Sequence, residues 1–384
     1  MKLGLSLKLT AAISGGAVTA DWAAWDGTND GAVTLLQTAG GRGVSSVTCV
    51  SATKALVAYT KAASNTSDLQ CLIATRDGLG ITENGNVDIT SGQQIRQKPT
   101  LCTLSETRAL VAYVNDTPAT DRCEIALIDT SGTTPVVLDT IQNLTYTAGT
   151  RQPELITMSE TQAVIQEISR VFTVNVSSDV LSLGNTVTLA SSRHGAITKM
   201  TSTSFAAASA TIVRRYTISG TTITADAQIT YSGVSITGDL EIVSVSETEL
   251  VVFYEISGLD QPMNAVPLTW SGSWALGSVI EVEDDRIFTQ DSRWSWALGD
   301  TRSIMLTYQK IDTSTEARYL IVTSDESHAL TVDVNYVSPF TASVQADHTT
   351  GDIFPGTDNK YVIAIGQEET TTPVKQICAA ILQG

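Results

Sequence analysis

A turn of small polar residues followed by an apolar run recurs along this chain of 384 residues. The clearest copies of the turn are Ser105-Glu106-Thr107, Ser159-Glu160-Thr161 and Ser246-Glu247-Thr248. Each copy precedes a run such as Arg108–Val114. Weaker copies follow the same pattern, and the seven copies start at residues 51, 105, 159, 202, 246, 299 and 357. The chain is therefore expected to consist of seven similar units of roughly fifty residues.

Each unit contains four predicted strands. In the second unit they are Lys98–Leu104, Arg108–Val114, Cys123–Ile128 and Val136–Leu144, separated by turns rich in Ser, Asp, Asn and Gly. The second and third strands are almost continuously apolar, which is typical of strands covered on both faces. Four strands in each of seven units predict an all-β fold, a seven-bladed β-propeller with four-stranded blades.

The seventh unit has only three strands, near His348–Phe354, Tyr361–Gly366 and Val374–Leu382. The missing strand is available as Ala32–Thr38, before the first unit, so we expect an N-terminal strand to complete the last blade and close the ring. An open array would need polar caps instead. Six or eight blades remain alternatives, because the repeats that start at Ser159 and Gly299 are the least regular. The predicted domains are an anchor segment, 1–29, and the propeller, 30–384.

Charge and cysteine usage exclude several classes of function. The net charge is −17 and the isoelectric point about 4.5, without the basic footprint that nucleic-acid binding requires. No apolar stretch is long enough to predict membrane insertion. The five cysteines recur on predicted first and third strands, and neither a CxxC motif nor a histidine pair accompanies them. They indicate buried core residues in a reducing compartment, with no disulfide framework, metal or cofactor. The cysteines are Cys49, Cys71, Cys102, Cys123 and Cys378. We expect Cys49 and Cys102 to share one first-strand position, and the other three to share one third-strand position.

The first ten residues alternate apolar and small or polar side chains, as an extended strand does, and precede a flexible Gly-rich stretch. A signal peptide is the alternative, but Lys8 interrupts the apolar region. We expect the segment to anchor the chain by adding to a sheet edge or groove of another protein. The predicted anchoring residues are Met1, Leu3, Leu5, Leu7 and Leu9.

This start, Met1-Lys2-Leu3-Gly4-Leu5-Ser6-Leu7 followed by glycines, resembles the N-termini of tailed-bacteriophage structural proteins. The resemblance implies a virion protein on the tail or capsid surface, made in the host cytoplasm and present in multiple copies. Its partners would be other virion proteins, bound through the N-terminal segment. The propeller would face outward, with a host-surface glycan or protein as a further candidate partner.

The pattern of titratable residues predicts no enzyme. His194, His328 and His348 fall in different repeats, and Asp347-His348 lacks a nucleophile. Asp284 and Asp285 lie in a charged turn, where a solvated loop explains them better than a glycosidase pair does. Asp26–Gly31 has oxygen ligands suited to calcium but lacks a distal glutamate, and a turn before the closing strand explains it equally well.

Four tryptophans are the candidate ligand-binding residues. Trp270 and Trp274 flank a predicted hairpin tip in the fifth unit, and Trp294 and Trp296 begin the sixth. Exposed, they would stack on sugars in a secreted or periplasmic lectin-like propeller, which is the alternative function. Packed across strands, they would be structural, and we favour this interpretation. A hydrolase with convergent acids in the central channel is a third hypothesis.

Overall fold

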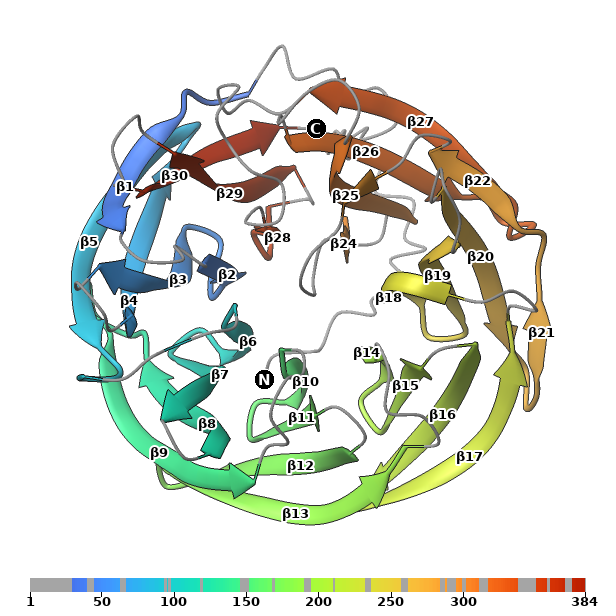
Figure 1. Cartoon of the computed structure of the whole chain (residues 1–384), viewed down its shortest axis with the longest axis horizontal. Coiled ribbons are helices and arrows are strands. Elements are labelled where there is room, and N and C mark those ends of the chain that lie inside the picture. The colour runs from blue at the N-terminus through green and yellow to red at the C-terminus, as the bar shows by residue number, and fades with distance from the viewer. Residues whose placement is uncertain are drawn as a thin grey trace, which may run out of the picture.

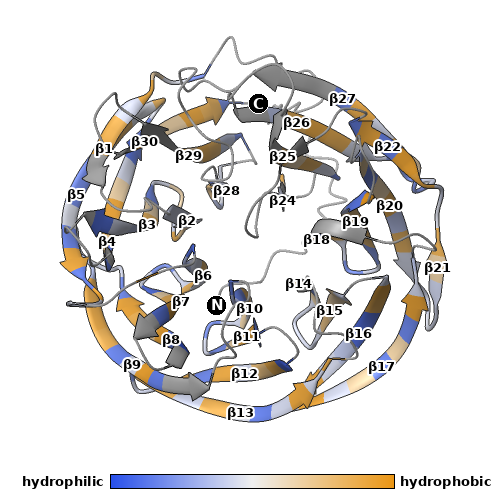
Figure 2. Ribbon diagram, viewed as in Figure 1, coloured by the Kyte–Doolittle hydropathy of each residue, from blue (hydrophilic) through white to orange (hydrophobic). Residues whose placement is uncertain are grey.

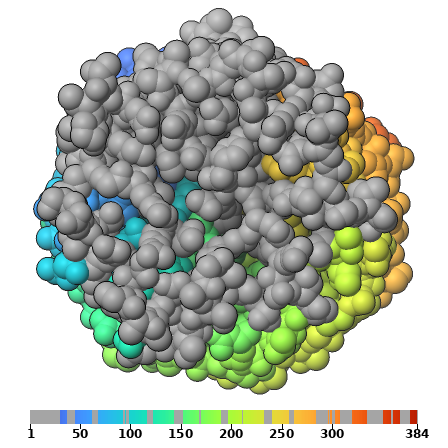
Figure 3. All heavy atoms as spheres, in the orientation of Figure 1, coloured from blue at the N-terminus to red at the C-terminus, as the bar shows by residue number. Residues whose placement is uncertain are grey.

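The computed structural model is a ring of seven antiparallel sheets around a central channel (Figure 1). In the space-filling view of the same orientation, the colours of the described residues follow the order of the chain around the ring (Figure 3). No helix among the residues described has the length and apolar character of a membrane span. The structure describes residues 30–39, 45–62, 67–92, 95, 98–117, 120–145, 152–167, 170–189, 195–209, 211–231, 236–256, 262–283, 287–288, 295–298, 302–310, 317–337, 350–357, 360–369 and 375–383.

Blades 1 to 4 are regular, with four strands each, ordered from the channel to the rim. Blade 1 is β2 (Ser45–Cys49), β3 (Lys54–Ala62), β4 (Ser67–Asp77) and β5 (Gly80–Asp88). Blade 2 is β6 (Thr100–Ser105), β7 (Arg108–Thr117), β8 (Thr120–Asp129) and β9 (Val136–Thr145). Blade 3 is β10 (Glu154–Ser159), β11 (Gln162–Glu167), β12 (Arg170–Ser177) and β13 (Val180–Thr188). Blade 4 is β14 (Gly195–Thr201), β15 (Ser204–Ser209), β16 (Ile212–Ser219) and β17 (Thr222–Thr230).

Blades 5 and 6 contain the split strands. Blade 5 is β18 (Ile236–Ser246), β19 (Glu249–Ile256) and β20 (Met263–Trp270), with two short outer strands, β21 (Trp274–Leu276) and β22 (Ile280–Glu283), both paired with β20. Blade 6 has two short inner strands, β23 (Ile287–Phe288) and β24 (Ser295–Ala297), both paired with β25 (Ser303–Lys310). β26 (Ala317–Ser324) and β27 (Leu330–Val337) complete it. The sequence predicted neither interruption.

Blade 7 confirms the predicted closure. It consists of β28 (Thr350–Ile353), β29 (Tyr361–Glu369), β30 (Lys375–Gln383) and, at the rim, β1 (Thr34–Ala39). β1 pairs antiparallel with β30, with Thr34 opposite Ala379. The residues just before β1 are also attached to β30: the Gly31 amide donates to the Ile381 carbonyl at 2.7 Å, and Asp30 accepts from the Gln383 amide at 3.1 Å. The N-terminal strand therefore occupies the outer edge of the last blade.

The apolar core lies between blades rather than inside each one. Seven buried clusters are present, and each combines residues of two consecutive blades, including one that joins blade 7 to blade 1. The middle strand β19 is buried along nearly its whole length, whereas most residues of the rim strand β13 are exposed. Hydrophilic and hydrophobic residues are interspersed along the rim strands (Figure 2). A single blade cannot bury its own faces, so the closed ring is the smallest unit with a complete core.

In several blades, a residue at the start of the second strand contacts the next blade. The first residue of that strand, here called the latch residue, is Lys54, Arg108, Gln162, Ser204, Glu249, Ser303 or Tyr361 in blades 1 to 7. Lys54 donates to the carbonyls of Ser131 and Gly132 in blade 2, and Gln162 donates to the Gly220 carbonyl in blade 4. Tyr361 lies 4.0 Å under the Arg76 guanidinium of blade 1. These three latch residues therefore reach the end of the third strand, or the turn that follows it, in the next blade.

Strand registers correct the expected equivalence of the cysteines. Cys49 pairs with Ala55, the second residue of its neighbouring strand, whereas Cys102 pairs with Leu110, the third. The two cysteines differ because Cys49 lies five residues before Lys54, the first residue of its second strand, whereas Cys102 lies six residues before Arg108. Cys71, Cys123 and Cys378 likewise lie at different levels of their strands. All five are buried free thiols, which confirms the expectation of core residues.

Candidate functional site

Two places bring polar side chains together, the central channel and the seam between blades 5 and 6. The channel cavity has a volume of about 480 Å³ and is lined by residues from the inner strands of all seven blades. These strands run side by side around the axis, so the channel wall is a circle of strand ends and strand edges (Figure 1).

Hydrogen bonds between neighbouring blades form part of the channel wall. The Thr103 hydroxyl donates to the Cys49 carbonyl at 2.9 Å, and the Thr157 hydroxyl donates to the Thr103 carbonyl at 2.6 Å. Asp352 accepts from the Cys49 amide at 2.7 Å and from the Thr48 hydroxyl at 3.2 Å. Burial and the neighbouring Asp352 carboxylate raise the pKa of the Cys49 thiol well above its usual range. This thiol is therefore a structural donor rather than a nucleophile.

Charged residues of the channel lie at two levels. Lys199 is the one basic residue among the described residues of the cavity wall, and Glu154, Glu241 and Asp352 are the acidic ones. The Lys199 ammonium donates to the Met158 carbonyl at 3.0 Å, and desolvation lowers the pKa of this amine. Glu154 and Glu241 are almost completely buried, and the Ser295 hydroxyl lies 3.4 Å from Glu241.

These channel residues were not among those predicted from the sequence. A signal was nevertheless present, since Glu154 and Glu241 both lie five residues before the serine that begins the recurring turn. Two repeats with the same acid at the same place indicate a shared position in the ring. No comparable signal identifies Lys199, because the equivalent residues of the neighbouring blades, Thr157 and Ser244, are small and neutral.

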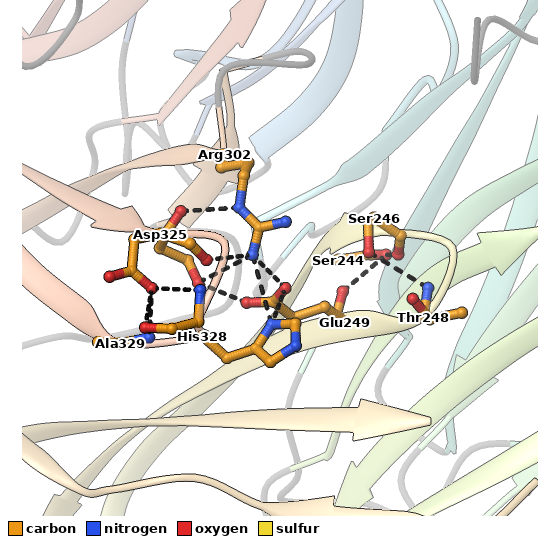
Figure 4. Close-up of polar contacts among 10 residues, drawn as sticks. Ser244, Ser246, Thr248, Glu249, Arg302, Asp325, His328 and Ala329 are labelled. Atoms are coloured by element: carbon orange, nitrogen blue, oxygen red, sulfur yellow. Dashed lines mark hydrogen bonds and ion pairs between the residues drawn. The ribbon is translucent and has the colours of Figure 1, made fainter. Parts of the chain in front are cut away.

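The seam between blades 5 and 6 is built around the latch residue Glu249, whose side chain is 1% exposed (Figure 4). Its carboxylate accepts from the Arg302 guanidinium and the Ser324 hydroxyl, and lies 2.6 Å from Nδ1 of His328. Because an ionised carboxylate only accepts hydrogen bonds, Nδ1 carries the proton of this contact. Three donors from blade 6 therefore converge on one buried charge from blade 5.

The backbone around this cluster is held in a restricted conformation. Arg302 and His328 both have positive φ, 57° and 65°, which non-glycine residues rarely adopt. Asp325 fixes the turn that carries His328: it accepts from the Ser327 hydroxyl and amide and from the Ala329 amide. These bonds, led by the one from the Ser327 side chain, lower the pKa of Asp325. The cluster thus has a fixed geometry (Figure 4).

The tryptophan candidates separate into two groups. Trp270 and Trp274 face each other across the β20–β21 hairpin, with ring centroids 5.1 Å apart and an interplanar angle of 67°. The Arg215 guanidinium lies 4.9 Å from the Trp270 ring, and the Trp274 indole donates to the Ala227 carbonyl at 3.1 Å. Both rings are half-buried and pack against blade 4. Trp296 is placed by its backbone in β24, opposite Met305.

Several predicted sites lie outside the described residues. These are Trp294, His194, His348, Asp347, Asp284, Asp285 and the anchoring residues Met1, Leu3, Leu5, Leu7 and Leu9. Of the calcium-like segment only Asp30 and Gly31 are described, and both bond to β30. Among the described residues, no group of three or more His, Cys, Asp or Glu side chains is arranged to hold a metal ion.

Comparison with known proteins supports the fold. No protein-family model matches this chain, and no curated protein matches it. Solved structures do. The β-propeller domain of Nup133 from Vanderwaltozyma polyspora has a TM-score of 0.52 at 10% identity, covering 91% of this chain and all of that chain. The α-L-arabinanase of Penicillium chrysogenum, solved with arabinobiose, has a TM-score of 0.51 at 10% identity, covering 92% of this chain and 98% of that chain.

A protein of unassigned function from Desulfotomaculum acetoxidans has a TM-score of 0.51 at 10% identity, covering 79% of this chain and 89% of that chain. These similar structures include an enzyme and a propeller domain described without an activity. At such low identity they establish the fold alone, because one propeller scaffold carries many unrelated functions. The chain is a seven-bladed β-propeller.

Proposed function

We propose that this protein is a non-enzymatic structural and interaction module, a virion protein on the tail or capsid surface of a tailed phage. Residues 1–29 dock it to other virion proteins, and the propeller faces outward, toward the host surface. The observation that carries the proposal is the closure of the ring by β1. Because β1 supplies the rim of blade 7 and Asp30 and Gly31 bond to β30, the ring needs no strand from residues 1–29.

The polar groups of the ring support a role in assembly rather than in catalysis. Channel hydroxyls such as those of Thr103 and Thr157 bond to the backbone of the preceding blade. The carboxylate of Glu249 is enclosed by its partners in blade 6. Side chains of this kind stabilise the contacts between blades, and a stable ring is a suitable carrier for an exposed binding face.

The glycan-binding alternative depends on exposed tryptophans. Trp270 and Trp274 stack on each other, and Arg215 and the Ala227 carbonyl occupy further sides of the pair. A sugar would have to displace these contacts before it could stack on either ring. The two described side chains therefore give this alternative no support, and we do not advance it.

The proposal is tested by comparing the full chain with a chain that begins at Asp21. Each is produced in a host infected by a phage that lacks the wild-type gene. Both chains should give the same circular dichroism spectrum and the same melting temperature, because both retain β1. Only the full chain should co-purify with phage particles. Equal incorporation of the two chains, or the absence of both from particles, would refute the anchor.

A further inference from the structure

One level of the channel wall is built from equivalent residues of the inner strands, one from each blade. Each of these residues pairs with the second residue of the following strand, and all of them line the cavity of about 480 Å³. In blade 4 this residue is Lys199. In the other blades it is uncharged: Cys49, Thr103, Thr157, Ser244, Ala297 and Ile353.

The contact that Lys199 makes between blades does not require an amine. The Thr103 and Thr157 hydroxyls each donate to the carbonyl of the equivalent residue in the preceding blade, at 2.9 and 2.6 Å. The Lys199 amine donates to the carbonyl of Met158, the residue after Thr157, at 3.0 Å. A threonine hydroxyl makes this kind of contact elsewhere in the ring, so the long side chain and the amine of Lys199 have no structural explanation.

The environment of Lys199 favours the neutral amine. The side chain is half-buried in the channel wall, and its desolvation lowers the pKa of the amine. A neutral lysine amine has a lone pair on nitrogen, and lysines activated by desolvation attack carbonyl groups. The hydrogen bond to the Met158 carbonyl uses an N–H of the amine and leaves this lone pair available. Lys199 is therefore a nucleophile that faces an open cavity.

The cavity selects a reaction partner by size and by charge. A volume of about 480 Å³ falls within the range of small-molecule sites, roughly 300–1,000 Å³. The described wall carries three acidic side chains, Glu154, Glu241 and Asp352, against one amine, so it disfavours an anionic ligand.

Asp352 does not pair with Lys199. Its carboxylate accepts from the Cys49 amide and the Thr48 hydroxyl of blade 1. Its strand, β28, lies across the channel from β14, the strand of Lys199 (Figure 1). The partner that fits the lysine is therefore a small electrophile without a negative charge.

We propose that Lys199 forms an imine with a small, uncharged aldehyde that enters the channel. The amine nitrogen attacks the carbonyl carbon and a C–N bond forms. The carbonyl oxygen then leaves as water, together with the two hydrogens of the neutral amine, and a C=N bond remains. The step needs no oxidant, reductant or further reactant, and water reverses it. This site is independent of the docking role proposed above.

The test uses the full chain with glyceraldehyde as the probe and sodium cyanoborohydride, which reduces an imine to a stable secondary amine. Mass spectrometry of peptides then gives the labelling rate of each lysine. Lys199 should be labelled at least about tenfold faster than the exposed Lys61, because the neutral amine is the reactive form. An equal or lower rate at Lys199 overturns the proposal.

Two further aldehydes test the selection by the channel. A dextran that carries aldehyde groups is too large for the cavity, so it should label Lys61 and leave Lys199 unlabelled. Glyoxylate is small but anionic, and its preference for Lys199 over Lys61 should be weaker than that of glyceraldehyde. Labelling of Lys199 by the dextran, or an equal preference with glyoxylate, overturns the selection by size or by charge.

The variant Lys199→Thr introduces the residue that blade 3 has at this level, Thr157. It should melt as the unaltered chain does and lose the fast phase of glyceraldehyde incorporation. Lys61→Thr is the matched control and should keep the fast phase. A fast phase that persists in Lys199→Thr overturns the assignment to this lysine. The labelling measurements use the unaltered chain, so they decide the question even if the variant does not fold.

Discussion

The latch residues of blade 2 and blade 5 both contact the following blade, but they carry opposite charges. In blade 2 the latch residue is Arg108, whose guanidinium contacts the exposed Asp179 of blade 3 at 2.8 Å. In blade 5 it is Glu249, whose buried carboxylate forms hydrogen bonds with Arg302, Ser324 and His328 of blade 6. The exposed pair adds little stability, because water competes for both partners. The buried charge depends on its partners, since none of them can be removed without leaving it poorly solvated.

The two seams also differ in how their strands are built. Blades 2 and 3 have uninterrupted four-stranded sheets, whereas the outer strand of blade 5 and the inner strand of blade 6 are each split into two short pieces. Glu249 itself is paired on both sides, with Ser246 of β18 and Thr269 of β20. The contrast between the two seams therefore rests on the burial of their side chains, since the Glu249 side chain is 1% exposed and that of Asp179 is 48% exposed.

The largest effect is expected from Glu249→Ala. Removal of the carboxylate leaves Arg302, Ser324 and His328 without their common acceptor, and the chain should lose about 3 kcal/mol of unfolding free energy. Urea titration followed by circular dichroism measures the loss. Glu247→Ala, in the exposed turn two residues earlier, is the control and should change stability by less than about 0.5 kcal/mol. Equal stability of the two variants would show that the buried Glu249 carboxylate does not stabilise the seam.

A smaller loss is expected at the seam where the ring closes. Asp352 of blade 7 accepts from the Cys49 amide and the Thr48 hydroxyl of blade 1, so Asp352→Ala should cost about 1–3 kcal/mol. The measurement is the same urea titration, with the exposed Asp333→Ala as its control. Asp352→Asn retains an acceptor oxygen and should recover part of the loss. No recovery would mean that shape, rather than the hydrogen bonds, matters at this position.

The pH dependence of the seam between blades 5 and 6 should come partly from Asp325. Hydrogen bonds from Ser327 and Ala329 lower the folded-state pKa of this carboxyl below its unfolded value, which is about 3.9. Its contribution is therefore present above the unfolded pKa and is lost as pH falls through the folded pKa. The melting temperature of Asp325→Asn should lie below that of the unaltered chain at neutral pH, and the two should converge toward pH 3. A constant difference down to low pH would contradict this assignment.

The smallest effect is expected at the exposed latch of blade 2. Arg108→Ala should cost about 0–1 kcal/mol, since the Asp179 side chain is 48% exposed. A double-mutant cycle with Asp179→Ala isolates the coupling of the pair, and added salt should reduce it. A coupling as large as the Glu249 effect would remove the distinction between the two seams.

The repeat allowed the blade count and the closure by an N-terminal strand to be predicted. Both follow from local information, because the turn beginning with Ser105 and the apolar run after it recur in nearly every unit. The expected equivalence of Cys49 and Cys102 was wrong, because counting back from the recurring turn aligns Cys49 with Thr103, and the strand registers agree with that count. The split strands of blades 5 and 6 were missed because short apolar pieces do not reveal where pairing stops.

The polar clusters were harder to predict than the blades. Glu249, Arg302 and His328 are far apart in the sequence, and they meet because the turn between β18 and β19 of blade 5 lies beside the turn between β26 and β27 of blade 6. Lys199 likewise lines the channel because the inner strands of consecutive blades lie side by side. Their positions could be read from a repeat alignment, but the contacts depend on side-chain direction across a seam. The anchor residues Met1, Leu3, Leu5, Leu7 and Leu9 stay a prediction.

The pairing of β1 with β30 also determines when the protein can finish folding. Thr34 leaves the ribosome early, but its partner Ala379 is made about 350 residues later, which takes roughly 20–70 s at ribosomal speed. Throughout this delay the first strand has no sheet to join, and blade 1 lacks its neighbour in blade 7. Joining the two ends is an encounter between distant parts of the chain, and such encounters are slow. Newly made chains should therefore pass through an incomplete, open ring, and it is at this stage that chaperones would act.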